Sequence, residues 1–303
     1  MPRLRRNKHT VIGASSARTS DIYTDRLDIT SLKSCRQLFS RHENVDAVVH
    51  CAAIAHASPG MYPDIHYHNT NALGTKNIID SAIDFGAKKF VMISTVSVYG
   101  EFDLPDLVSE STTRNPLGPY GISKKNAEDY CFERKDEIDL YTFRMTPMYG
   151  NDWLFNIRGK VVAPVIGKFF LVRMDSESHR YSFCSNRNGA EAVLWAIENR
   201  MKPEIYNVAD DYDYCLNDVL NGVISVEGKK AVLNIPRFLP VLLMKLLIRI
   251  LRGRDRKANW KSRYWKFFRN NVYSTARLKS TGFNARPHFL DVVVRGEPEL
   301  HKP

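Results

Sequence analysis

Short apolar runs alternate with segments of helical periodicity through the first half of the chain. The runs at 45–53, 90–100 and 139–150 are rich in β-branched and aromatic residues and end at small residues, which is typical of strands buried on both faces. Apolar side chains recur at helical spacing over 71–89 and 120–134, which predicts two helices. Strand alternating with helix predicts βαβ units, a parallel sheet and right-handed crossovers.

The alternation weakens after Gly150. Helices are predicted at 189–200 and 215–228, with a strand at 204–211 between them. Residues 238–253 are strongly apolar with cations interspersed. We predict that some of these later elements pack back onto the sheet.

Together these patterns predict an α/β fold, a Rossmann-like doubly wound parallel sheet followed by a smaller lobe. We assign residues 1–150 to the sheet domain and residues 151–303 to the lobe. A chain of 303 residues with 44% hydrophobic content is large enough for this arrangement.

The net charge of +11 comes from a basic N-terminus and a basic cluster between Arg249 and Arg269. Such an excess favours phosphorylated substrates, acidic lipid or nucleic acid as partners. Only the charge supports nucleic acid, so no nucleic-acid partner is predicted. No uncharged apolar run approaches the roughly 20 residues that span a bilayer.

Cysteine and histidine spacing gives no sign of disulfides or metal. The five cysteines are far apart and odd in number, which favours a reducing, cytoplasmic compartment. His66 and His68 flank Tyr67 without a nearby carboxylate or cysteine partner. No metal site is therefore predicted.

Three residues form a candidate catalytic group. Tyr120 and Lys124 are four apart on a predicted helix, so both side chains lie on one face. A lysine ammonium beside the phenol is expected to lower the tyrosine pKa and make Tyr120 a usable acid or base. Thr95 ends a predicted parallel strand, where α/β sheets place their ligands. The alternative is that the Tyr-x-x-x-Lys spacing occurs by chance on a surface helix.

The segments around these residues carry six short motifs in one order. The motifs are LDIT (27–30), VVHCAA (48–53), NALGT (71–75), STVSVYG (94–100), PYGISK (119–124) and RMTPMYG (144–150). With them the chain resembles the extended short-chain dehydrogenase/reductase family, in particular its nucleotide-sugar epimerases and dehydratases, over roughly residues 8 to 290.

The resemblance implies a bound NAD or NADP, held in residues 1–150. Asp28 matches the aspartate that contacts the adenine amino group, with the backbone of Ile29 beside it. Ala52 and Ala53 match the loop beneath the cofactor. Asn71 matches the asparagine that holds the active-site helix and a water. From the residues alone, Asp28 could instead cap a local turn and Asn71 could N-cap a helix.

The resemblance also implies roles at the reacting centre. Thr95, Tyr120 and Lys124 match the catalytic Ser/Thr, Tyr and Lys, and Lys124 also contacts the nicotinamide ribose. Pro147 falls in the loop that flanks the nicotinamide. Arg180 matches an arginine that pairs with the substrate diphosphate, although an exposed salt-bridging arginine is the alternative. His50 and Cys51 are interpreted as packing residues at a strand end.

The stretch VIGASSARTS (11–20) looks like a phosphate-binding turn but lies too close to Asp28. Fifteen steps separate Gly13 from Asp28, too few for a helix, a strand, a connection and another strand. We therefore assign this stretch to the second strand. The first strand, the glycine-rich loop and most of the first helix are expected to be absent, through a misassigned start or a true truncation. Ser15 or Ser16 with Arg18 nearby favours NADP over NAD.

Three functions remain open. The first is an NAD(P)-dependent epimerase, dehydratase or reductase acting on a nucleotide-diphosphate sugar. The second is a truncated, impaired family member that acts as a binding or dimerisation partner. The third is peripheral membrane contact through 239–257, against the favoured interpretation that this helix packs in the lobe with its cations facing solvent or a diphosphate.

The resemblance further implies a homodimer. Relatives commonly pair the helices that begin near Asn71 and Tyr120 into a four-helix bundle. We expect Ala127, Tyr130 and Cys131 to form the seam.

Overall fold

A computed structural model describes most of the chain. The described residues are 9–17, 25–42, 44–55, 61–100, 102, 104–150, 157, 170–174, 179–199, 201–227, 231–236, 238–250 and 269–286. The chain divides into two compact units. The first, here the sheet unit, comprises Met1–Gly100, Thr113–Arg144 and Ala192–Tyr206; the second unit comprises Glu101–Thr112, Met145–Glu191 and Asn207–Pro303. The assignment of cofactor to residues 1–150 and substrate to residues 151–303 stays a prediction.

A four-stranded sheet forms the centre of the sheet unit. Its order is β11-β6-β4-β3, with bounds β3 Ala47–His50, β4 Lys89–Thr95, β6 Asp139–Met145 and β11 Ile205–Val208. β3 and β4 are parallel, with Val48 opposite Phe90. The predicted doubly wound α/β fold is confirmed, and β11 is a late element that joins the sheet as expected.

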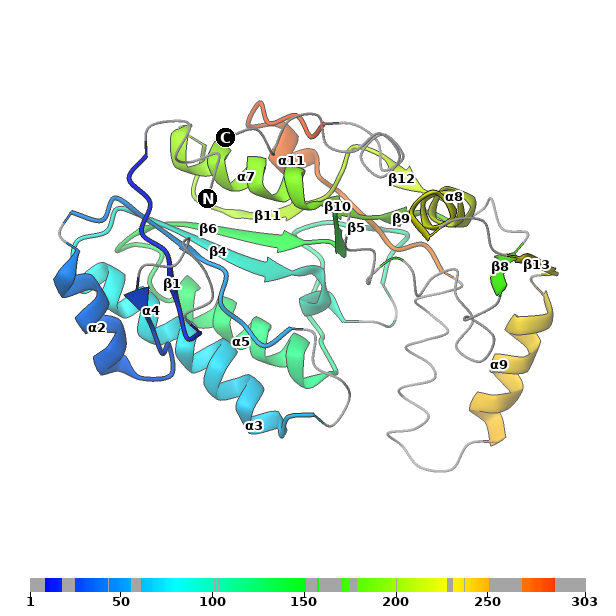
Figure 1. Ribbon diagram of the computed structural model, residues 1–303, viewed down its shortest axis with the longest axis horizontal. Coiled ribbons are helices and arrows are strands. Elements are labelled where there is room, and N and C mark those ends of the chain that lie inside the picture. Colours follow the sequence, from blue (N-terminus) through cyan, green and yellow to red (C-terminus); the bar gives the residue numbers. More distant parts are fainter. Residues whose placement is uncertain are drawn as a thin grey trace. The chain divides into compact units, whose positions relative to one another are not determined.

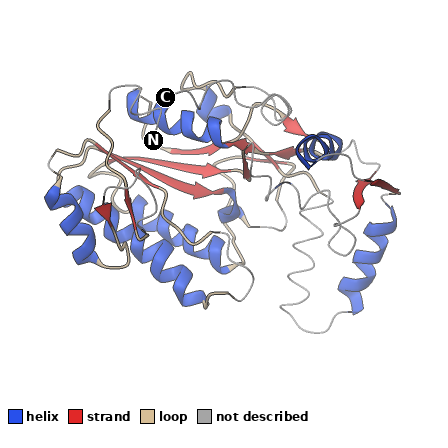
Figure 2. Cartoon of the chain, viewed as in Figure 1, coloured by secondary structure: helices blue, strands red, loops and turns tan. Residues whose placement is uncertain are grey.

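Helices cover the sheet as the apolar spacing requires (Figures 1 and 2). One face carries α3 Asp64–Tyr67, the π-helical segment η1 His68–Leu73, α4 Gly74–Asp84 and α5 Pro119–Phe132. The helix α2 Leu32–Arg41, which the periodicity did not predict, is N-capped by Ser31 through a bond from the Ser34 amide. The α7 helix, Asn186–Glu198, lies above the opposite face (Figure 1).

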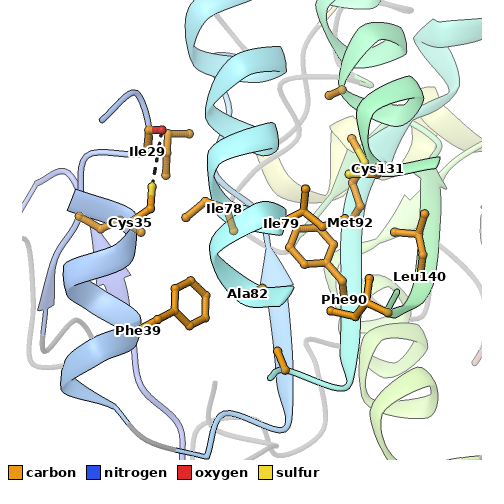
Figure 3. Close-up of a cluster of buried hydrophobic side chains, with 14 residues drawn as sticks. Ile29, Cys35, Phe39, Ile78, Ile79, Ala82, Phe90, Met92, Cys131 and Leu140 are labelled. Atoms are coloured by element: carbon orange, nitrogen blue, oxygen red, sulfur yellow. Dashed lines mark hydrogen bonds between the residues drawn. The ribbon is translucent and has the colours of Figure 1, made fainter. Parts of the chain in front are cut away.

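An apolar cluster lies between the helices and the sheet (Figure 3). Ile78, Ile79 and Ala82 of α4 meet Phe90 and Met92 of β4. The cluster continues through α2 and α5, where Cys35, Phe39, Ala127 and Cys131 are buried. The predicted dimer seam is therefore wrong at Ala127 and Cys131, because both side chains are fully buried within this core.

The strand of the opening stretch stands apart from the four-stranded sheet. β1 Ala14–Ser15 pairs in parallel with β2 Asp25–Arg26, and the chain then reaches Asp28. Among the described residues, no strand bridges β1 and β3. β1 and β2 thus form a parallel pair of their own.

In its described residues the second unit contains short strand pairs, several helices and the first residues of α7. The strands pair as β7 Met148–Tyr149 with β10 Cys184–Ser185, β9 Tyr181–Ser182 with β12 Asp213–Tyr214, β5 Leu107–Val108 with β14 Val272–Tyr273, and β8 Phe170–Met174 with β13 Ala231–Ile235. Its helices are α8 Leu216–Glu227, α9 Phe238–Ile250 and α11 Ala276–Lys279.

A buried carboxylate lies in the second unit. Asp210 accepts hydrogen bonds from Tyr149 (2.6 Å), Tyr214 (2.9 Å), the Asn188 side chain (2.6 Å) and the Ser185 amide (3.0 Å). Burial raises the pKa of Asp210 above its usual value, and these bonds oppose the rise.

None of the described helices is long and apolar enough to cross a membrane.

Candidate active site

Thr95 and Tyr120 meet at the carboxyl end of β4. Thr95 is the last residue of the strand and caps the short 3₁₀ helix η2, Val96–Tyr99, by accepting a bond from the Ser97 amide at 3.2 Å. The Tyr120 phenol hydrogen-bonds with the Thr95 side chain. A Cβ at Gly121 would lie 2.9 Å from the Ser97 carbonyl oxygen. Gly121 therefore lets the start of α5 approach η2 closely enough to bring Tyr120 to Thr95.

Lys124 lies one turn further along α5 and is buried, with 2% of its surface exposed. Its ammonium donates a hydrogen bond of 2.7 Å to the Ile93 carbonyl oxygen of β4. Burial lowers the pKa of Lys124 to about 8, and the nearby Glu128 carboxylate opposes this shift. Lys124 is therefore mostly protonated at pH 7 and loses its proton as the pH rises through about 8.

The structure corrects the expected effect of Lys124 on Tyr120. Burial raises the pKa of the Tyr120 phenol above its usual value, and the hydrogen bond from Thr95 opposes the rise. The Lys124 ammonium is directed to the Ile93 carbonyl. Thr95, rather than Lys124, is therefore the group that favours the phenolate in this state.

Asn71 joins two parts of the site. Its Oδ1 accepts a bond from the Ile54 amide (2.7 Å), and its Nδ2 donates to the Ile54 carbonyl (3.0 Å) and to Ser123 Oγ (3.0 Å). Ser123 belongs to α5 and Ile54 to the loop after β3. The N-cap alternative for Asn71 is wrong, because the residue lies inside η1 and its side chain is directed away to these partners.

Asp28 and the loop after β3 are accessible. Asp28 is exposed, and its Oδ1 accepts bonds from the Thr30 amide (2.9 Å) and the Thr30 hydroxyl (2.7 Å). The turn-capping role is therefore real, and it leaves the carboxylate at the surface. Ile29 is buried and packs against Gly74. After β3, Ala52 is exposed and Ala53 half-buried.

Pro147 and Arg180 belong to the second unit. The Pro147 carbonyl accepts a bond of 3.1 Å from the Cys184 amide, and Arg180 is exposed with its amide bonded to Asn270 Oδ1 at 3.0 Å. Their predicted roles toward cofactor and substrate stay predictions. Arg18, invoked for the choice of NADP, lies outside the described residues.

A buried ion pair beneath Lys124 was missed by the sequence analysis. Glu128 follows Lys124 by one turn and accepts bonds from Ser94 (2.6 Å), from Arg144 Nη2 (2.7 Å) and from Arg114 (3.0 Å). Arg144 also lies over the Tyr99 ring, 4.7 Å from its centroid. Arg144 within the apolar strand LYTFRMT was the available signal, because arginine is almost never fully buried unless it is paired.

His50, at the end of β3, is confirmed as a packing residue. It is buried, and its Nε2 is 2.9 Å from Thr75 Oγ1, which itself donates to the Asn71 carbonyl at 2.6 Å. The imidazole therefore donates from Nε2, as the bond network assigns it. Burial, with the charge of Lys124 adding to it, lowers the pKa of His50 to about 3.

This shift predicts a pH-dependent stability. Between pH 6.5, the usual pKa, and about pH 3, the folded pKa, His50 is protonated in the unfolded chain but neutral in the folded protein. Stability should therefore fall as pH decreases below about 6.5, by up to about 1.4 kcal/mol per pH unit. Urea unfolding of the wild type and of His50→Gln between pH 4.5 and 7.5 measures this. The variant should show a flatter profile, and the exposed His66→Gln control should follow the wild type; parallel profiles for His50→Gln would contradict the assignment.

NAD fits the described residues at its two ends. The Asp28 carboxylate after β2 and Ala52 after β3 are exposed, Ala53 is half-buried, and Tyr120 and Lys124 lie at the end of β4. The sequence contains neither Gly-x-x-Gly-x-x-Gly nor Gly-x-Gly-x-x-Gly.

The comparisons with known proteins agree with this geometry. A model of the NAD dependent epimerase/dehydratase family matches residues 1–209, and the chain belongs to this family. It is 31% identical over 127 residues to UDP-glucuronate 4-epimerase of Thermodesulfobacterium geofontis, covering 41% of this chain and 39% of that protein. It is 34% identical over 178 residues to UDP-glucose 4-epimerase of Vibrio cholerae, covering 56% of this chain and 54% of that protein. The alignments thus span about half or less of these relatives.

Solved structures share the fold over nearly the whole chain. The UDP-Glc/GlcNAc 4-epimerase from Campylobacter jejuni superposes with a TM-score of 0.74 at 16% identity, covering 97% of this chain and 92% of that one. MoeE5 in complex with UDP-glucuronic acid and NAD gives a TM-score of 0.67 at 18% identity, covering 94% and 89%. At these identities the likeness shows the fold alone, a Rossmann-like α/β fold.

Proposed function

We propose that this chain is an NAD-dependent epimerase or dehydratase of a nucleoside-diphosphate sugar, with Thr95, Tyr120 and Lys124 as its catalytic residues. The contact between Tyr120 and Thr95 above a buried Lys124, at the carboxyl end of a parallel strand, carries the proposal. The family and its UDP-sugar epimerases support the substrate class.

Each residue has a distinct task in this mechanism. Tyr120 Oη moves a proton to or from the reacting sugar hydroxyl. Thr95 donates a hydrogen bond that stabilises the phenolate or the sugar oxygen. Lys124 places a positive charge beside the centre, and Asn71 holds α5 in position. NAD, when bound, supplies hydride acceptance, with Asp28 and the Ala52–Ala53 loop at its adenine end and Lys124 at its nicotinamide end.

The substrate side rests on fewer residues. Arg180 is the proposed partner of the diphosphate, since an exposed guanidinium can bind two phosphate oxygens at once. Pro147 is proposed to flank the nicotinamide.

NAD is favoured over NADP by the family and by the NAD complexes of the structural neighbours. The free cysteines support a cytoplasmic location.

Incubation with nucleotide sugars tests the proposal. The purified chain is mixed with UDP-glucose, UDP-glucuronate or UDP-N-acetylglucosamine and NAD or NADP, and the products are resolved by NMR. We expect a C4 epimer or a dehydrated keto sugar from at least one of them. Unchanged sugars in every mixture, with a folded protein, would reject the enzymatic proposal.

Cofactor binding should depend on Asp28. Its replacement by alanine removes one charge-assisted hydrogen bond to the adenine amino group, so the Kd for NAD should rise about tenfold or more. Calorimetric titration measures the change. Thr30→Ala is the control, because it removes a turn bond to Asp28 and keeps the carboxylate. Equal affinity of Asp28→Ala and the wild type would refute this role.

A second candidate is a catalytically impaired binding or dimerisation partner. It is the alternative to the enzymatic proposal. Titration of NADH fluorescence separates the two candidates, since only the enzyme must bind the cofactor.

The homodimer also stays a prediction, with the exposed Ile122 and Phe132 of α5 as the apolar residues available for it.

A further inference from the structure

The α9 helix presents a continuous apolar stripe to solvent. Leu242, Leu243, Leu246 and Ile250 are 52%, 57%, 46% and 74% exposed, and Leu239 is exposed as well. Their spacing of three and four residues places them on one side of the helix. Single exposed leucines are ordinary, but a contiguous apolar surface marks an interaction site.

Two cations follow one border of this stripe. Lys245 and Arg249 are one turn apart on α9, and both are exposed. At 100° per residue they lie beside Leu242, on the edge of the stripe away from Leu243. Neither makes an ion pair among the described residues. An apolar stripe bordered by cations is the pattern of a helix that lies in a membrane interface, where the aliphatic stems remain in the apolar layer and the charges meet lipid phosphates.

The charge of the whole chain selects the kind of membrane. The net charge of +11 favours an anionic surface. A second copy of the chain would bring the same cations toward one another, and nucleic acid would leave the leucines in water. An anionic bilayer satisfies both the leucines and the cations.

We propose that α9 binds the surface of an anionic membrane, with Leu239, Leu242, Leu243, Leu246 and Ile250 in the acyl boundary and Lys245 and Arg249 at the phosphates. The helix then lies in the plane of the interface. This inference is independent of the proposed enzymatic activity.

Flotation with lipid vesicles tests it. The full chain is mixed with vesicles of phosphatidylcholine alone or with a quarter of phosphatidylglycerol, at low and high salt. We expect flotation with the anionic vesicles, weakened by salt, and little with the neutral ones. Leu242→Asp/Leu246→Asp should abolish it, and Lys245→Glu/Arg249→Glu should reduce the partition coefficient about tenfold or more.

Matched controls distinguish the surface from a general effect. Leu107→Asp changes an exposed leucine on β5, and Lys88→Glu changes an exposed cation in the sheet unit; both should float like the wild type. Circular dichroism verifies that each variant is folded. Failure of the wild type to float with anionic vesicles overturns the proposal. So does equal flotation of the leucine variant, or a change from dimer to monomer by light scattering without any lipid binding, which would assign the stripe to a second copy.

Discussion

Tyr120→Phe should reduce turnover of the UDP-sugar substrate about a hundredfold or more while the protein stays folded. The phenol hydroxyl is the group placed beside Thr95 for proton transfer, and removal of a general acid or base typically costs this much. Phenylalanine keeps the ring that packs at the start of α5. The measurement is kcat with the substrate identified by NMR, together with a circular dichroism spectrum.

The nearby Tyr130 provides the matched control. It lies on the same helix and is half-buried, and no catalytic role is assigned to it. Tyr130→Phe should therefore keep kcat within a small factor of the wild type. A Tyr120→Phe variant with near-normal kcat would remove Tyr120 from the mechanism.

Arg144→Met should destabilise the protein by about 3–5 kcal/mol. The Arg144 guanidinium bonds to both oxygens of Glu128, and the two side chains are 2% and 3% exposed. Loss of the arginine leaves a buried carboxylate without its main partner, and such a charge costs several kcal/mol. The free energy of unfolding from urea titration measures the effect.

Two further variants show whether the cost comes from the Glu128 carboxylate, which in Arg144→Met keeps only Ser94 and Arg114 as partners. Arg134→Met breaks a bond of 2.8 Å to Asp80 near the surface, so it should cost at most about 1 kcal/mol. The double variant Arg144→Met/Glu128→Gln should be more stable than Arg144→Met alone, because no buried charge is left unpaired. A loss below about 1 kcal/mol for Arg144→Met would show that the pair is dispensable.

Periodicity predicted the elements that build the central sheet. The strands at β3, β4 and β6 and the helices α4 and α5 lie where apolar runs and helical spacing indicated. The ends were less predictable. The third strand was predicted to stop at Pro147, and β6 ends at Met145, two residues before this proline, whose nitrogen carries no hydrogen to donate to a ladder. The helix expected from residue 71 begins earlier, at α3 and η1, because tertiary contacts with α5 extend it.

The sequence predicted the side chains of the candidate site but not the backbone atoms that they contact. Thr95, Tyr120 and Lys124 were found from spacing and motif, and the structure brings Thr95 to Tyr120 with Lys124 buried one turn away. The partner of the Lys124 ammonium is a backbone carbonyl, which no sequence pattern marks. Nor does any sequence pattern mark Ile54, whose main-chain amide and carbonyl bond to the Asn71 side chain.

The Asn71 amide makes the site behave as one body. It fastens the loop after β3 at two backbone atoms and α5 at Ser123, so the loop cannot move without breaking bonds that hold the helix. A ligand that settles on Ala52 and Ala53 thereby restrains the residues that hold Tyr120 and Lys124. The Asn71 side chain is therefore the link between the loop after β3 and the helix that carries the proposed acid and base.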